Sequence, residues 1–228
     1  MEWRRLDIDR IEAALRALLD QTVEAETWER LHEEPLTPDA TRRMLEGYRA
    51  VDALLADRVD LFGYGESERI LELNHMVLCG PSPERRSQYA SHLAATRRSF
   101  YDDSRGGVAA LMDRYGRSRK HAPEVLAAKI YAQAVSAPQL FLEGNSRTAA
   151  LLASYLLARA GLPPLVVTTA TLREYHKLVE RCAAIERDGI TGMIGFGFAA
   201  SKLAHFIRES RDTAFLAPDS APLPAGGL

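Results

Sequence analysis

The sequence is poor in cysteine and aromatic residues and has no strong excess of either charge. Only two cysteines occur, Cys79 and Cys182, far apart and without a motif around them. We expect them to be small buried groups in a reducing compartment, because a chain of this length needs no disulfide or metal for stability. The net charge is −2, so the basic surface of nucleic-acid-binding proteins is missing. We therefore expect no nucleic-acid partner.

Long hydrophobic runs are also missing. No uninterrupted apolar segment approaches the ~20 residues that cross a bilayer, and residues 1–20 are amphipathic and acidic, unlike a secretory signal. The sequence therefore predicts a cytoplasmic protein with no membrane partner. With 46% apolar and 26% charged residues, the composition is that of a globular chain.

The apolar residues recur at helical spacing along nearly the whole chain, which predicts an all-α fold. Thr37 followed by Pro38 is a typical helix start, because Thr caps and Pro fits the first helical position. Before the middle of the chain, the pattern predicts helices over 6–32, 37–59, 66–78, 82–100 and 108–115. Residues 165–169 are β-prone but too isolated to form a sheet.

The most apolar segments lie in the middle of the chain. Residues 123–137 and 146–160 predict two central helices that are hydrophobic on most faces. Two further helices are expected over 171–186 and 196–209. We divide the chain into an N-terminal helical extension (1–36), a main domain (37–210) and a tail (211–228) that we expect to be disordered, because it is rich in proline and glycine.

One segment between the two central helices, Gln139 to Thr148, carries residues suited to anion binding. A turn containing Gly144 leads directly into a helix, whose first N–H groups point out of its end and attract anions. A cation such as Arg147 is unfavourable in the first turn of a helix because of the helix dipole, unless an anion binds at that turn. Glu143 is placed to hold a divalent metal, and Asn145 to cap the helix or bind an oxygen. The alternative is an ordinary loop-to-helix connection.

This segment resembles the signature of the Fic/Doc (Fido) family, H-x-F-x-[DE]-G-N-G-R-x-x-R. The matching residues are Phe141, Glu143, Gly144, Asn145 and Arg147. The flanking runs 122–137, 146–167, 171–182 and 66–78 resemble family helices, so the resemblance covers residues 37–210. It implies a helical bundle in which a phosphate-binding loop joins two central helices.

The resemblance also implies a function. Family members transfer part of a nucleotide, most often AMP from ATP, to a hydroxyl of another protein; related members transfer a phosphate or phosphocholine instead. By resemblance, Glu143 would hold Mg²⁺ and Asn145 would grip the α-phosphate. Gly144 and Ser146 would complete that cradle at the helix start, and Arg147 would bind beside the β-phosphate. Phe141 would anchor the loop. The implied cofactors are Mg²⁺ and ATP or another nucleotide.

Three positions depart from the family pattern. Gln139 stands where the family has its general-base histidine, and an amide cannot accept a proton near neutral pH. Ala150 replaces the last arginine of the motif, and Ser146 replaces its second glycine. Because general-base catalysis contributes roughly 10²–10⁴-fold, AMP transfer should be weak or absent.

Two further features relate to this resemblance. An inhibitory helix in some members has the pattern [ST]-x-x-x-E-[GN]. Here Glu46-Gly47 follows Thr41 with one residue too many, so Glu46 is either a relic or an ordinary surface residue. The candidates for a histidine that replaces the missing base are His75, His92, His121, His176 and His205. His176 and His121 belong to segments on which either could approach the pocket, but we expect each of them to be a surface or hydrogen-bonded histidine.

Two functional hypotheses remain at this stage. One is a Fic-type transferase with impaired or altered chemistry at the retained phosphate loop. The other is a non-catalytic module that binds a target or regulatory protein, for example a toxin–antitoxin partner. A homodimer is compatible with the sequence.

Overall fold

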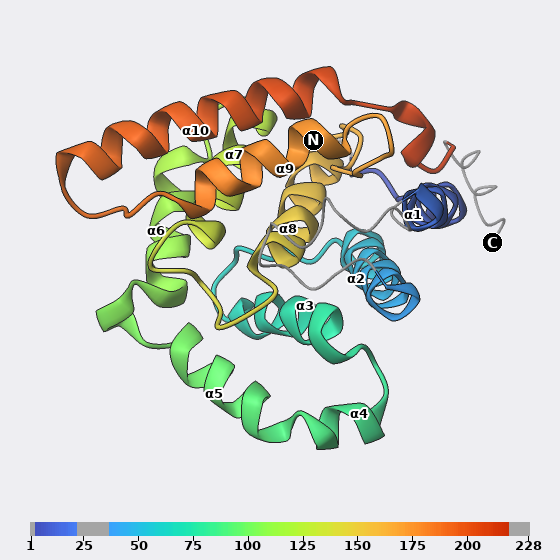
Figure 1. The fold of residues 1–228 in the computed structure, drawn as a ribbon, viewed down its shortest axis with the longest axis horizontal. Helices are drawn as coiled ribbons and strands as arrows, with labels where there is room; N and C mark the ends of the chain where they lie inside the picture. Colours follow the sequence, from blue (N-terminus) through green and yellow to red (C-terminus); the bar gives the residue numbers. More distant parts are fainter. Residues whose placement is uncertain (1–2, 22–36, 219–228) are drawn as a thin grey trace, which may run out of the picture.

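The computed structural model describes residues 3–21 and 37–218 and confirms the all-α prediction (Figure 1). The helices are α1 (Ile8–Gln21), α2 (Pro38–Ala56), α3 (Ser67–Cys79), α4 (Pro83–Gln88), α5 (Ala90–Phe100), α6 (Gly107–Ser118), α7 (Pro123–Val135), α8 (Asn145–Arg159), α9 (Leu172–Ala183) and α10 (Gly189–Glu209). Two 3₁₀ turns, Asp103–Arg105 and Thr213–Phe215, complete them. Within the described part, extended backbone pairs only at the isolated bridges Leu6–Leu216 and Ala137–Glu186.

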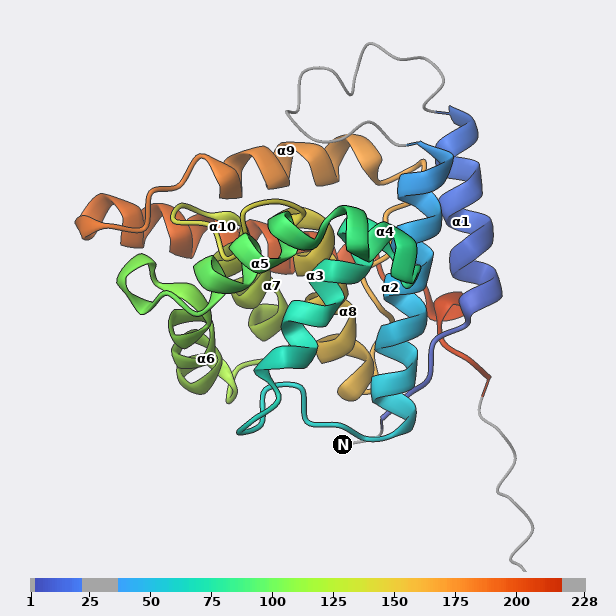
Figure 2. The ribbon, with the colours of Figure 1, turned by 90° about the horizontal axis from the view of Figure 1, so that it is seen from below.

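Helices α7 and α8 form the centre of the bundle. Every residue of α8 from Thr148 to Ala158 is buried, which explains why this helix is apolar on all faces. In the view of Figure 1, helices α1 and α2 lie to the right of α8, α6 lies to its left, and α9 and α10 cross above it. Helices α4 and α5 lie across α3 (Figure 2).

The start of α2 follows the predicted capping pattern. Thr37 has extended backbone geometry, and its hydroxyl accepts from Ala40 N–H at 3.0 Å. Further along α2, a Cβ on Gly47 would stand 2.5 Å from a Leu151 methyl, so the small residue lets α2 approach α8 closely. The buried Tyr48 hydroxyl donates to Leu165 O at 2.6 Å and thereby holds the extended segment after α8.

The predicted helix boundaries are wrong in two places. The helix expected over 82–100 breaks at Tyr89, whose ψ of 6° leaves the helical region between α4 and α5. Helix α10 starts at Gly189, seven residues before the predicted start at 196. Glycine disfavours helices, but a Cβ on Gly192 would collide with Glu186 O, so this sharp chain reversal requires glycine there.

The first and last described segments pack together. Leu6 N–H donates to Asp52 Oδ1 at 2.9 Å, and Ala217 N–H donates to Arg5 O at 3.0 Å. Phe215 is 6% exposed and belongs to the same hydrophobic core as α1. The expectation of a disordered tail from residue 211 is therefore wrong for 211–218, because apolar side chains there find partners on the first helix. Residues 22–36 and 219–228 lie outside the described residues.

The two cysteines, Cys79 and Cys182, are both free and buried, as predicted.

Among the described helices, α10 alone is long and apolar enough to cross a membrane by length and composition. The mean hydropathy of its most apolar 18 residues is 1.3, and 39% of those residues are buried in the bundle.

A charged cluster joins α2 to α4. Asp39 accepts hydrogen bonds from Arg43 and from both terminal nitrogens of Arg85. The hydrogen bond from Arg85, aided by the nearby arginine charges, lowers the Asp39 pKa to about 2. A carboxylate with a lowered pKa stabilises the fold above its unfolded pKa, near 4, and loses that effect as the pH falls through 2.

We therefore predict that Asp39→Asn lowers the free energy of unfolding by about 1 kcal/mol at pH 7, since the group is partly exposed to solvent. The deficit relative to wild type should shrink as the pH falls from 4 towards 2. Urea denaturation at a series of pH values measures it. Asp113→Asn, whose carboxylate pairs with Arg117 on the surface of α6, is the control. An Asp39→Asn deficit that is independent of pH would contradict the electrostatic account.

Candidate functional site

The loop between α7 and α8 starts at a half-buried arginine clamp, in which Arg187 binds three backbone carbonyls. Arg187 Nη1 donates to Gln133 O at 2.6 Å and to Ser136 O at 2.7 Å, and Nη2 donates to Pro138 O. Burial lowers the Arg187 pKa to about 10. These carbonyls follow or end α7, where cations are favourable. Arg187 thus fixes the chain directly before Gln139, a role that sequence analysis missed because the two lie 48 positions apart.

Asn145 closes the loop on itself. Its Oδ1 accepts from Phe141 N–H at 2.8 Å, and its Nδ2 donates to Phe141 O at 2.9 Å and to Gln139 Oε1 at 3.2 Å. The side chain is buried, at 7% exposure. Its two amide protons and its oxygen are all used within the loop, so in this structure Asn145 positions the loop instead of presenting its amide to a ligand.

A second amide fixes the turn that leads into α8. The fully buried Asn74 of α3 donates to Glu143 O at 2.9 Å and to Thr148 Oγ1 at 3.1 Å. Gly144 has a φ of 74°, and a Cβ there would lie 3.2 Å from Asn74 Nδ2. Glycine is therefore required both by the left-handed backbone and by the close approach of α3.

This turn orients the start of α8. Thr148 N–H donates to Gly144 O at 2.9 Å, the bond with which α8 starts, and the dipole of the helix favours an anion at this end. Ser146 is buried at 5% exposure, whereas Gln139 and Glu143 are exposed. The predicted anion-holding groups are thus brought together on one loop, with two polar side chains at its solvent side.

The loop is anchored to the core as expected for Phe141. Its ring is 2% exposed and stacks on Phe100 of α5, with centroids 5.3 Å apart and planes 5° apart. Ala150, at the position of the missing arginine, is buried at 3% exposure. A charged side chain at that position would have to leave the core to reach a ligand.

Glu143 lies beside His92, one of the five histidines considered as substitutes for the missing base. His92 Nε2 of α5 lies 3.6 Å from Glu143 Oε2, and the Glu143 side chain is 53% exposed. His176 and His121 have the ordinary structural roles that we expected for them. His176 is buried on α9 beside Tyr175, and His121 lies at the Ser118 carbonyl before α7. His92 comes close to Glu143 because α5 packs over the loop, and no pattern in the sequence predicts that contact.

Two arginines converge at the end of α3. Arg147 Nη1 donates to Val77 O at 3.2 Å, and Arg43 Nε of α2 donates to the same oxygen at 3.0 Å. Cations are favourable at a helix C-terminus, so both guanidinium groups have a structural role in addition to any ligand. Glu46 pairs with Arg49 on the surface of its own helix, at 2.6 Å, so it does not clamp the loop as an inhibitory glutamate would.

The side chains at the loop suit a magnesium ion that is held mainly by the phosphates of a bound nucleotide. Among the described residues, no group of three or more His, Cys, Asp or Glu is arranged to bind a metal. Mg²⁺ is commonly held by one or two carboxylates together with phosphate oxygens and water. A single exposed carboxylate beside a helix N-terminus, as Glu143 provides, fits that mode and not an all-protein cage.

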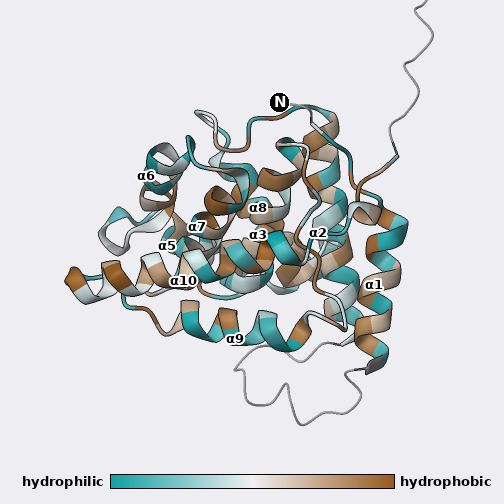
Figure 3. Ribbon diagram, turned by 90° about the horizontal axis from the view of Figure 1, so that it is seen from above, coloured by the Kyte–Doolittle hydropathy of each residue, from teal (hydrophilic) through white to brown (hydrophobic). Residues whose placement is uncertain are grey.

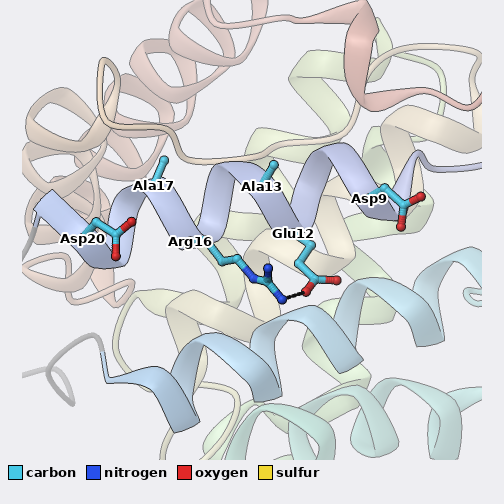
Figure 4. A pocket seen from close by; sticks show the side chains of 6 residues that line it. All are labelled: Asp9, Glu12, Ala13, Arg16, Ala17 and Asp20. Carbon is cyan, nitrogen blue, oxygen red and sulfur yellow. Dashed lines mark hydrogen bonds and ion pairs between the residues drawn. The ribbon is translucent and has the colours of Figure 1, made fainter.

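A surface hollow on α1 is separate from this loop. It is lined by Asp9, Glu12, Ala13, Arg16, Ala17 and Asp20 (Figure 4). All six residues come from one face of one helix, and Arg16 is paired with Glu12. The hollow lacks the convergence of several elements that ligand sites show.

The likeness of this chain to known proteins is structural. No family model matches the chain, and no curated protein matches it. A solved structure of a Fic domain containing signaling protein from Bacteroides thetaiotaomicron is similar, with 16% identity and a TM-score of 0.47, over 89% of this chain and 88% of that chain. A likeness this distant does not extend that protein's role to the present chain.

The arginine clamp gives a test of how the loop is held. Arg187→Ala should lower the free energy of unfolding by about 2 kcal/mol, because it leaves several partly buried carbonyls without a donor. Thermal and urea denaturation measure the loss. Arg181→Ala, at an exposed position on α9, is the matched control and should change stability by less than about 0.5 kcal/mol. Equal effects of the two substitutions would show that Arg187 is not a clamp.

Proposed function

We propose that this chain is a Fic-like protein that binds the phosphates of a nucleotide at the start of α8 and whose AMP transfer to protein hydroxyls is impaired or altered. The observation that carries the proposal is the loop itself. Asn145 and Asn74 fix its shape, so that the helix start and the exposed Glu143 carboxylate stand together, within a segment that resembles the family motif.

The phosphate-binding part of the site would work through the backbone. The first turn of α8 offers N–H groups and the positive end of the helix dipole to an anion. Glu143 would hold Mg²⁺, and that ion, when bound with ATP, would neutralise phosphate charge. The Ser146 hydroxyl is a further donor at this turn. Arg147 would add charge beside it while keeping its contact with Val77 O.

The part of the site that would activate a hydroxyl is incomplete. Gln139 Oε1 accepts from Asn145 Nδ2, which leaves the Gln139 amide protons for a ligand. An amide donor can orient a hydroxyl or a phosphate, but it cannot remove a proton. Positioning and electrostatic stabilisation do much of the work in phosphoryl chemistry, so a slow reaction is compatible with this site.

A second candidate function is a non-catalytic module that binds a target or regulatory protein, for example a toxin–antitoxin partner. The observation that favours it is the position of the cations. Arg147 and the buried Arg43 both contact Val77 O, and Ala150 offers no charge at all. A site that has kept its shape but engages its arginines structurally suits nucleotide-dependent regulation as well as catalysis.

Labelled ATP separates these functions. Wild type, Gln139→His and Glu143→Gln are incubated with Mg²⁺ and ATP labelled at either the α- or the γ-phosphate, and label on the protein and on lysate proteins is counted. We expect little or no α-label with wild type and a gain of roughly 10²-fold or more with Gln139→His, since a general base is restored. Glu143→Gln, combined with Gln139→His, should abolish that gain.

Other outcomes have distinct meanings. Rapid α-labelling by wild type would refute impaired transfer; if that labelling disappears in His92→Gln, His92 is the group that accepts the proton. Labelling from γ-ATP alone would show phosphate transfer. If neither wild type nor Gln139→His takes up label or shows a thermal shift with Mg·ATP, the nucleotide-binding proposal is wrong.

A further inference from the structure

The N-terminal half of α10 carries large apolar side chains that nothing in the described chain covers. Ile190, Met193, Ile194 and Phe198 are 78%, 71%, 70% and 59% exposed. We call these four residues the α10 stripe. In Figure 3 this end of α10 is coloured as hydrophobic and extends beyond the neighbouring helices at the left of the view. Isolated exposed apolar residues are common, but a contiguous group of them marks an interaction surface.

The stripe is a single helical face. Its members follow one another at spacings of three, one and four residues, which places them side by side along the helix. Gly197 lies among them, and a Cβ there would meet no other atom within 4 Å, so the surface is open at its middle. The opposite face, with Phe196, Ala199 and Leu203, is buried in the bundle. The stripe is thus not the core face of this helix.

The exposure of the stripe is that of an interaction patch. Each of its four side chains is more than half exposed, and a contiguous apolar patch on a monomer is often functional. Two copies in contact would cover both stripes at once, and the residues around the stripes would add to the area that a specific interface buries.

The charges at the two ends of the stripe are self-complementary. Residues 189–201 contain no charged side chain, and the segment is flanked by the exposed Asp188 and Lys202. In an antiparallel pair of α10 helices centred on Gly195, Asp188 of each copy stands opposite Lys202 of the other. Lys202 Nζ already lies 5.5 Å from the Phe198 ring centre, so the ammonium group borders the apolar surface.

We propose that the α10 stripe is a homodimer interface, in which α10 packs antiparallel against α10 of a second copy about a two-fold axis near Gly195. This arrangement makes the same patch serve both subunits, as two-fold symmetry requires. It is independent of the nucleotide site, because the stripe and the loop after α7 share no residue.

A membrane surface is the competing occupant. Helices that lie on anionic membranes carry many basic residues beside the apolar face. Helices α9 and α10 and their connection, residues 172–209, contain six Lys or Arg and five Asp or Glu, so this side of the bundle lacks that excess. The balanced charge and the complementary ends favour a second copy.

Sedimentation velocity of the full chain, from micromolar to hundreds of micromolar concentration, tests the interface. Wild type should show a reversible monomer–dimer equilibrium. Ile194→Glu should raise the dissociation constant at least roughly tenfold, because it places a charge in the centre of the buried patch. Tyr64→Glu, which alters an exposed aromatic residue outside the stripe, should leave the constant unchanged. Circular dichroism of each variant verifies that the helices are intact.

Charge reversal tests the antiparallel register. Asp188→Lys alone and Lys202→Asp alone should each weaken the dimer, and the double variant should restore the wild-type dissociation constant. Wild type that stays monomeric at every concentration would overturn the proposal. So would a dimer that is indifferent to Ile194→Glu. Monomers that bind phosphatidylcholine–phosphatidylserine vesicles through the stripe would assign it to a membrane instead.

Discussion

The side-chain amide of Asn145 determines the geometry on which the candidate site depends. Two apolar helices, α7 and α8, fill the centre of the bundle, and the backbone that joins them must find hydrogen-bond partners beside the core. Asn145 supplies two of these bonds, both to Phe141, and a third to the side chain of Gln139. Asn74 and Arg187 hold the two ends of the loop from α3 and from the segment before α10. The start of α8 is therefore fixed by polar contacts from three parts of the chain.

This arrangement separates two functions that the family motif combines. The features that would hold an anion come mostly from backbone and loop shape, and they do not need the residues at which this chain departs from the motif. Proton removal depends on one side chain, and Gln139 cannot perform it. Arg43 and Arg147 also have a structural role, because each donates a hydrogen bond to Val77 O. These features support the proposal that the site binds a nucleotide and that its AMP transfer is impaired.

The sequence predicted the helices well where apolar periodicity was strong and local caps were present. Thr37–Pro38 marked the start of α2, and the motif residues between the central helices proved to form one loop. Contacts between distant segments could not be predicted. Tertiary packing alone brings Arg187 to the start of the loop, His92 beside Glu143, and Phe215 into the core beside α1. Glycines also misled the prediction for α10, because a tight reversal and the packing of Phe196 outweigh their low helix propensity.

The central claim is that the start of α8 and Glu143 form a nucleotide-phosphate site. Calorimetric titration of ATP into wild type and Glu143→Gln, each with Mg²⁺ and with a chelator, tests it most directly. The Glu143 carboxylate is half exposed, so its replacement should leave the fold intact. We predict that Mg²⁺ strengthens ATP binding to wild type and has little effect on binding to the variant. An absence of ATP binding to wild type, or an equal Mg²⁺ effect in both proteins, would contradict the claim.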